Sequence, residues 1–463
     1  MGIKEFLKSY NSPVDECKLL SVLDQYRSTM DVNISRIAFA EMDKWSYSGG
    51  GDIVHESGKF FKIRGGESTN TETESVSYQP IIDQPEQGIL GIVSRINDGA
   101  VEILLQAKIE PGNLDSVQYS PTVQATKSNY TGVHRGGGVI YVEKFLDNSD
   151  KVVFRGLQSE HGYKFYKKAN YNVCVHDDDT EILDDKFIWL TLNDIRSLLT
   201  KEHCINMDTR SVLATIDFIG KSLSCDEIDM CKEFSVLERD ILLSSLSEDN
   251  ALYSFDEIYE WLSFKKNDKK INQRMVPLET LYNKDWDLSD KVLSSESNRN
   301  FELVGVRAIV GSREISSWCQ PIVLDNIPKV YAFIFKKINN IIHVLVQAVE
   351  EDYSWNGSEL GPSLHSISSE TFSPNEEMKS FNINEDHFDI IYDRFQSEEG
   401  GRFMEQKNRY LIFLVNEDTD VKINDSYKWI TLYQLKKMTK KECSVNIEAR
   451  TLLSISSYYK GEI

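Results

Sequence analysis

The chain carries one pattern twice at a constant spacing. Three segments of the first half recur 241 positions later (320 minus 79), with no gap between them. The pairs are Gln79-Pro80-Ile81 with Gln320-Pro321-Ile322, Gln106-Ala107 with Gln347-Ala348, and Pro121-Thr122-Val123-Gln124 with Pro362-Ser363-Leu364-His365. A repeat of this length indicates two copies of one folded unit.

The repeat fixes the domain organisation that we expect. A chain of 463 residues is too long for a single hydrophobic core. We predict an N-terminal helical arm over 1–33, a first repeat over 34–218, a helical connector over 219–273 and a second repeat over 274–463. Each repeat is predicted to be a compact α+β domain, because its consecutive strands are joined by turns too short for crossover helices.

Local signals recur in both copies. Asp98-Gly99 lies between two apolar runs and predicts a tight hairpin, and Asn339-Asn340 stands at the same place in the second copy. Thr191 with Asp194 predicts a capping box at the start of a helix. In the first repeat we also expect a strand over Val139 to Phe145, and a loop over Gly65 to Ser77.

Composition narrows the class of protein. The formal net charge is −21, which disfavours binding to nucleic-acid phosphates. Seven scattered cysteines form no CxxC pair and no cluster with zinc spacing, so we interpret them as reduced cytosolic thiols. No apolar run approaches membrane-spanning length, and the start of the chain has no signal-peptide pattern. We expect a cytoplasmic protein that binds neither nucleic acid nor membrane.

The stretch from Gln106 to Arg135 is the main candidate site. It begins in an apolar strand and turns into residues that favour turns and offer hydrogen bonds. A rigid strand that leads into a polar loop is a common location for a functional site.

Many segments, taken in order, resemble the NDP-hexose 2,3-dehydratase family over nearly the whole chain. In the first half they include Trp45, His55 to Phe61, Gln84 to Gly91, Gln106-Ala107-Lys108, Glu110-Pro111-Gly112-Asn113, Ser120 to Tyr130, Gln158-Ser159-Glu160 and Asn206 to Arg210. In the second half they include Arg313-Glu314, Trp318, Gln320-Pro321, Gln396 to Phe403, Asn408-Arg409-Tyr410 and Asn446 to Arg450.

The resemblance implies two tandem Nudix-like domains, in a homodimer, acting on a nucleotide-linked 4-keto-6-deoxyhexose. It implies no metal and no organic cofactor for the elimination, and an NAD(P)H-dependent 3-ketoreductase as pathway partner. The sequence contains no Nudix box, so pyrophosphate hydrolysis is disfavoured.

The implied reaction needs a base, an acid and donors for a developing enolate oxygen. We interpret Glu160 or His134 as the base and Tyr130 or His55 as the acid, and the sequence does not choose between them. The residues that we expect to bind substrate are Gln106, Lys108, Glu110, Thr122, Gln124, Asn129, Arg135, Ser159, Lys164, Ser397, Glu398 and Arg402.

The second repeat departs from the family pattern. His365 stands where that repeat usually has Gln, and Asp352 to Trp355 replace a Pro-Gly loop. We therefore favour the first repeat as the catalytic one. The alternative hypothesis is a non-catalytic nucleotide-sugar-binding protein in which both loops bind and neither reacts.

Overall fold

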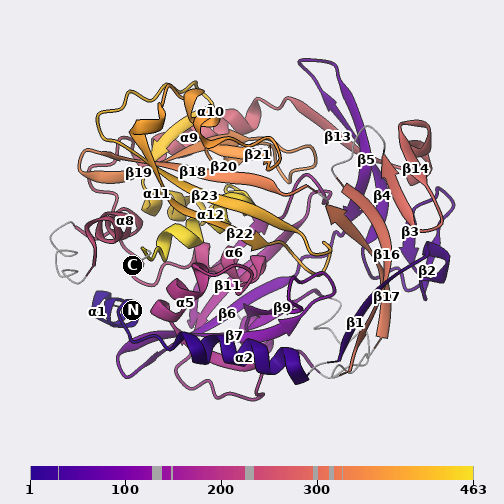
Figure 1. The fold of residues 1–463 in the computed structure, drawn as a ribbon, viewed down its shortest axis with the longest axis horizontal. Coiled ribbons are helices and arrows are strands. Elements are labelled where there is room, and N and C mark those ends of the chain that lie inside the picture. The colour runs from indigo at the N-terminus through magenta and orange to yellow at the C-terminus, as the bar shows by residue number, and fades with distance from the viewer. Residues whose placement is uncertain are drawn as a thin grey trace.

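The fold is that of a computed structural model, which describes residues 2–29, 31–127, 138–146, 150–224, 234–295, 301–311, 317–325 and 327–461. Each repeat is built around a seven-stranded mixed sheet, and the two sheets lie one above the other in Figure 1. The first contains β10 (Val152–Ser159), β11 (Ala169–His176), β6 (Ile89–Asn97), β7 (Ala100–Ile109) and β12 (Phe187–Thr191) in that order, with β8 (Val117–Pro121) on β7 and β9 (Val123–Ala125) on β6.

The second sheet repeats this plan strand for strand. Its path is β20 (Glu359–Gly361), β19 (Ile341–Val349), β18 (Lys329–Ile338), β23 (Lys407–Val415) and β22 (Phe388–Ser397), with β21 (Leu364–Ser368) on β18 and β24 (Tyr427–Ile430) on β19. Both sheets contain one parallel pair, β6 with β11 and β18 with β23. The predicted tandem α+β architecture is confirmed.

The predicted hairpin turns are confirmed as well. Asn97 pairs with Ala100 across the turn, and Asp98 and Gly99 have φ angles of 48° and 71°. Asn339 and Asn340 have φ angles of 52° and 66° in the second copy. Asp, Asn and Gly tolerate this left-handed conformation, which a two-residue hairpin of this type requires.

Two smaller sheets show that the repeats are interlocked. One contains β13 (Ile271–Val276), β4 (Lys62–Asn70), β3 (Ile53–His55), β2 (Trp45–Tyr47) and β5 (Val76–Asp83), and the other contains β1 (Val32–Ile37), β16 (Phe301–Val310), β15 (Val292–Ser295), β14 (Trp286–Leu288) and β17 (Ser317–Asp325). In each, the first strand comes from the opposite repeat, so β13 pairs with β4 and β1 pairs with β16. Each repeat therefore receives a strand from the other repeat.

The matched tryptophans reinforce this exchange. The indole Nε1 of Trp45 donates to the backbone oxygen of Cys319 at 2.7 Å, and that of Trp286 donates to Tyr78 at 2.8 Å. Each tryptophan thus contacts the repeat to which it does not belong. Satisfying a buried indole N–H in this way fixes the relative position of the two repeats.

The helices cover the sheets and fill the space between them. They are α1 (Ile3–Tyr10), α2 (Glu16–Thr29), α4 (Glu143–Leu146), α5 (Leu192–Leu199), α6 (Met207–Thr215), α8 (Val236–Leu246), α9 (Phe255–Asn267), α10 (Pro374–Lys379), α11 (Leu432–Met438) and α12 (Ile447–Ser457), with 3-10 turns η1 (Phe39–Glu41), η2 (Leu278–Asn283) and η3 (Glu385–His387). Helices α6 and α12 pack against each other between the two large sheets (Figure 1), within one apolar core. The capping box of Thr191 and Asp194 is present at α5.

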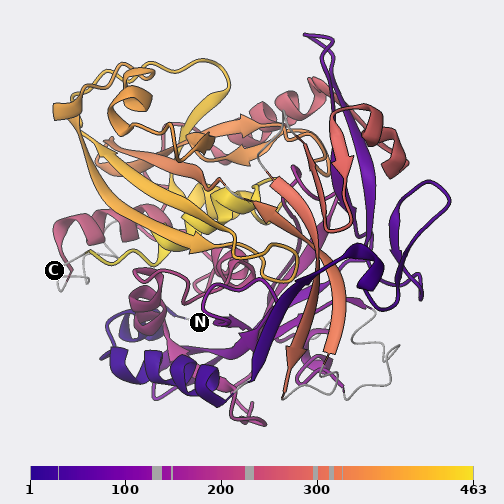
Figure 2. The same ribbon diagram turned by 45° about the vertical axis from the view of Figure 1, so that its right-hand side comes forward.

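Two local predictions were wrong. Gly65 to Ser77 is not a loop, because β4 extends to Asn70 and forms with β5 the long hairpin that projects at the upper right in Figure 2. Pairing with β13 stabilises this strand despite its Gly, Ser and Thr content. Val139 to Phe145 is not a strand but a turn that leads into α4, where Phe145 packs in the core.

Two further observations concern the environment of the chain. The five cysteines in the described part are free thiols, namely Cys17, Cys174, Cys204, Cys319 and Cys443. Within the same residues, no helix is both long enough and apolar enough to cross a membrane.

Candidate active site

The two large sheets place two equivalent polar clusters at the ends of their strands, and each cluster is completed by a loop from the other repeat. The loop after β10 reaches the second repeat, where Tyr353 donates its N–H to the oxygen of Gly162 at 2.7 Å. The loop after β22 reaches the first repeat, where Gly112 donates to the oxygen of Gly400 at 2.7 Å. Each site is therefore composite.

The first cluster is rich in carboxylates. Glu110 lies directly after β7, Glu160 directly after β10 and Asp208 at the start of α6, and Glu399 comes from the loop of the second repeat. Each of Glu110, Glu160 and Asp208 is at most 8% exposed. A Cβ on Gly401 would lie 3.4 Å from Oε1 of both Glu110 and Glu399, which places the two carboxylates side by side across the repeat boundary.

Cations and amides hold these carboxylates in place. Lys108 and Gln124 donate to Oε1 of Glu110 at 3.1 and 2.9 Å. Asn170 donates to Oε1 of Glu160 at 2.7 Å. The remaining oxygens of Glu110 and Glu160, both Oε2, are buried and have no hydrogen-bond partner among the described residues, so they could act on a bound molecule.

The helix cap of α6 is part of the same network. Asn206 accepts the N–H of Thr209 at 2.9 Å, and its amide nitrogen donates to Gln124 at 3.2 Å. The cap thereby links Gln124 to the first turn of α6, which contains Asp208. The motif of Asn206, Asp208 and Arg210 was recognised in both repeats from the sequence, but not as part of a site.

The pKa values of two carboxyl groups are strongly raised. Burial and the charges of Glu160 and Glu110 raise the pKa of Glu399 to about 7, although Arg402 and Lys168 oppose the shift. Burial together with the charges of Glu399 and Glu160 raises the pKa of Asp208 well above its usual range. A carboxyl group that is protonated near neutral pH can act as a general acid beside ionised carboxylates.

The second cluster has the same positions with different chemistry. Glu351, His365 and Glu448 correspond to Glu110, Gln124 and Asp208, and Glu398 corresponds to Glu160. The equivalent of Glu399 is His161, whose Nδ1 lies 2.9 Å from Glu448 and whose Nε2 lies 3.1 Å from Glu398.

His161 offsets part of the negative charge of the second cluster. Burial alone would lower the pKa of His161, but its bonds to the two glutamates raise it well above the usual value. The protonated imidazole and the hydroxyl of Tyr410, which donates at 2.8 Å, hold the pKa of Glu398 down to about 2 despite burial. His161 thus links Glu398 and Glu448 in the second cluster, whereas the corresponding residue of the first cluster, Glu399, is an acid with a raised pKa.

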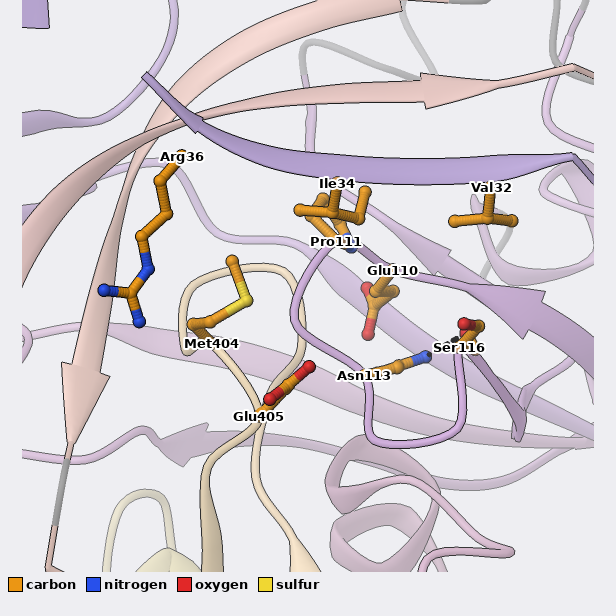
Figure 3. A pocket seen from close by; sticks show the side chains of 9 residues that line it. All are labelled: Val32, Ile34, Arg36, Glu110, Pro111, Asn113, Ser116, Met404 and Glu405. Carbon is orange, nitrogen blue, oxygen red and sulfur yellow. Dashed lines mark hydrogen bonds between the residues drawn. The ribbon is translucent and has the colours of Figure 1, made fainter. Parts of the chain in front are cut away.

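A cavity of about 220 Å³ opens beside the first cluster. It lies between β1, the loop after β7 and the loop of the second repeat, and Figure 3 shows Glu110 and Arg36 among the side chains that line it. Arg36 is exposed and extends from β1 along this cavity. An arginine at the mouth of a carboxylate site suits a phosphate group.

The structure brings together only some of the side chains predicted from the sequence. Lys108, Glu110, Gln124, Glu160 and Arg402 belong to the first cluster, and Arg402 also donates to Gln84 at 3.1 Å. Asn129, Tyr130, His134 and Arg135 lie outside the described residues.

Other predicted residues have structural contacts instead. Gln106 donates to the oxygens of Pro121 and Thr122, and the hydroxyl of Thr122 donates to Leu104 and accepts from Val93. His55 lies on β3 and packs edge-on against Trp45 and Phe60.

Four predicted residues lie at the second cluster or between the repeats. Glu398 is in the second cluster, and Lys164 binds Asp325 at 2.7 Å. Ser159 donates to Glu359 and Ser397 donates to Gln118. Sequence reasoning missed Asp208, Lys168, Asn170 and Glu399. For Glu399 the reason is physical, since it comes from the opposite repeat and an exchange of loops leaves no signal in a linear motif.

Comparison with known proteins agrees with this architecture. The family model for NDP-hexose 2,3-dehydratase matches residues 16–216 and again 255–455. The chain belongs to the NDP-hexose 2,3-dehydratase family.

Named relatives span nearly the full chain. A dTDP-4-dehydro-6-deoxy-alpha-D-glucopyranose 2,3-dehydratase of Saccharopolyspora spinosa is 34% identical over 433 residues, covering 91% of this chain and 87% of the relative. The enzyme of that name from Amycolatopsis orientalis is 34% identical over 438 residues, covering 91% and 86%.

Similarity to solved structures is local. An Ap4A hydrolase of C. elegans matches 29% of this chain and 98% of its own, with 17% identity and a TM-score of 0.19. The NUDIX domain of Shewanella oneidensis NrtR, in complex with ADP ribose, matches 27% and 82%, with 11% identity and a TM-score of 0.19.

Proposed function

We propose that this protein removes water across C2 and C3 of a nucleotide-linked 4-keto-6-deoxyhexose, and that the first cluster is its catalytic site. The observation that carries the assignment of the site is the contrast at one position. The first cluster has Glu399, whose pKa is about 7, where the second has His161. The first cluster thus combines a carboxyl group that can hold a proton near neutral pH with the Oε2 atoms of Glu110 and Glu160, which have no hydrogen-bond partner among the described residues.

The chemistry follows from the C4 ketone, which acidifies the hydrogen on C3. In this proposal the free Oε2 of Glu160 removes that proton, and the electron pair moves into an enolate at C4. Nearby ammonium and guanidinium groups, those of Lys168 and Arg402, stabilise the negative charge.

Loss of the C2 hydroxyl completes the elimination. The carboxyl proton of Glu399 passes to the departing oxygen, so one water leaves and a C2–C3 double bond forms. The resulting enol takes a solvent proton at C2 and becomes a 3,4-diketo-2,6-dideoxy sugar. A raised carboxyl pKa suits this donor role at neutral pH.

The direct test is incubation with a 4-keto-6-deoxyglucose nucleotide in D2O, with and without a 3-ketoreductase and NADPH. We expect mass spectrometry to show loss of one water and gain of one deuterium at C2. The variant Glu160→Gln should lose activity by at least ~100-fold, the lower end for a general base. Substrate that binds and stays intact would favour the non-catalytic binding protein instead.

Partners and compartment remain proposals. We infer a homodimer and a reductase partner from the family resemblance, and a cytoplasmic location from the free thiols. Light scattering of the purified protein tests the first, and co-purification with a 3-ketoreductase tests the second. A monomer at micromolar concentration would contradict the dimer.

A further inference from the structure

The second cluster contains three potential metal ligands that the proposed elimination does not use. Glu351 lies just after β19, His365 on β21 and Glu448 at the start of α12. One ligand atom of each lies within 4.8 Å of the others. His365 Nε2 is 3.6 Å from Oε1 of Glu351 and 4.0 Å from Oε2 of Glu448.

Each carboxylate is oriented through one oxygen and leaves the other free. Oε2 of Glu351 accepts the N–H of Gly162 at 2.7 Å, and Oε1 of Glu448 accepts from His161 at 2.9 Å. The opposite oxygens face His365. Contacts that fix ligands from behind in this way are typical of metal sites.

Glu448 is buried, and one of its carboxylate oxygens accepts no hydrogen bond from the described residues. Its side chain is 1% exposed, and its Oε2 has no hydrogen-bond partner in the described part of the chain. Within the same residues, Nε2 of His365 makes no hydrogen bond, and its nearest carboxylate oxygen is that of Glu351 at 3.6 Å. A buried carboxylate oxygen without a donor is costly, and a cation between these atoms would satisfy both groups.

We propose that Glu351, His365 and Glu448 bind one divalent transition-metal ion, with Zn²⁺ the best match. Bonds of about 2.0–2.1 Å in a tetrahedron place neighbouring ligand atoms roughly 3.3–3.4 Å apart. The separations from His365 are longer, at 3.6 and 4.0 Å, so the side chains would move closer together around the ion. Two carboxylates balance the ion's charge, and His365 supplies an imidazole nitrogen. The fourth position is open to water or to an oxygen of a bound ligand.

The first cluster lacks this set of ligands because one residue differs between the repeats. There Gln124 replaces His365, and its amide donates a hydrogen bond to Glu110 at 2.9 Å. An amide donor in that place supplies no imidazole ligand and satisfies the glutamate directly. His365 therefore supplies a metal ligand where the first cluster has a hydrogen bond between Gln124 and Glu110. This proposal does not depend on the elimination assigned to the first cluster.

The test is zinc binding by the full-length protein. After treatment with chelator and its removal, titration calorimetry with Zn²⁺ alone should give one site per chain. His365→Gln should weaken that site at least ~100-fold, since loss of even an outer-shell contact costs 10–100-fold. His387→Gln, at an exposed position of η3, is the matched control and should bind as wild type does.

Cobalt provides a readout that does not depend on activity. Co²⁺ in the wild-type site should give the visible absorption of a low-coordinate N/O site, and His365→Gln should lose it. Glu351→Gln, checked for folding by circular dichroism, should lose it as well. Zinc binding that is equal in wild type and in both variants, or absent from folded wild type, would overturn the proposal and leave His365 as an ion-pair partner.

Discussion

Replacing Glu399 by Gln should make the protein more stable at alkaline pH. The folded state raises the pKa of this carboxyl group from 4.5 to about 7, because burial and two neighbouring carboxylates disfavour its charge. Between these pH values the folded protein holds a proton that the unfolded chain releases. The free energy of unfolding therefore falls as pH rises from 4.5 to 7.

The magnitude follows from the pKa values. One pKa unit corresponds to about 1.4 kcal/mol, so the shift of Glu399 costs about 3 kcal/mol of stability above pH 7. A Gln side chain has no charge in either state. The stability gained by Glu399→Gln should therefore be about 3 kcal/mol greater at pH 8 than at pH 4.5.

Urea denaturation of wild type and Glu399→Gln at the two pH values measures this difference. Glu370→Gln, an exposed position, controls for the loss of one negative charge from an acidic protein. The stability gain of Glu399→Gln could prove no more pH-dependent than that of the control. That result would refute the conclusion that folding raises the pKa of Glu399.

Three further predictions concern the rate and the contacts between repeats. Above about pH 7 the rate constant kcat/KM should fall about tenfold per pH unit as Glu399 loses its proton, and pH profiles of Glu399→Gln should lack this limb. Gly112→Ala should destabilise the protein by about 3 kcal/mol, since its Cβ would lie 1.8 Å from the oxygen of Phe403, whereas Gly138→Ala, with open space around it, should unfold in urea as wild type does. Arg210→Met should lower the free energy of unfolding by about 3 kcal/mol, because the backbone oxygens of Ile205 and Ser397 lose a buried donor. Thermal unfolding measures this loss, and Lys379→Met, at an exposed position, is the control.

Much of the local structure could be predicted because it depends on short-range chemistry. The turns at Asp98-Gly99 and Asn339-Asn340 require residues that tolerate positive φ, and the cap at Thr191 needs an acceptor and a matching acid. The tandem architecture could be predicted because the same residues recur at one constant spacing, which indicates two copies of one folded unit.

The exchange between repeats could not be predicted in this way. The pairing of β1 with β16 and of β13 with β4 depends on contacts between segments that are far apart in the sequence. No local pattern in these strands indicates which strand each one pairs with. The β4 strand was taken for a loop because its Gly, Ser and Thr residues obtain their stability from that partner.

Only the part of the site that comes from a single repeat could be predicted from the sequence. Glu110, Gln124 and Glu160 follow strands of the first repeat, so their proximity follows from the sheet. Glu399 and Arg402 come from the other repeat, and nothing in the sequence indicates that their loop reaches the first cluster. A pseudosymmetric chain can complete each site with a loop from its opposite copy.

The comparison of two adjacent residues tests the central claim most directly. Glu398 and Glu399 are neighbours in the chain but belong to different clusters, so Glu398→Gln and Glu399→Gln form a matched pair. With a 4-keto-6-deoxyglucose nucleotide and a trapping reductase, water loss per folded protein should fall at least ~100-fold in Glu399→Gln. It should change less than about threefold in Glu398→Gln. The reverse pattern would place catalysis in the second cluster and contradict the account.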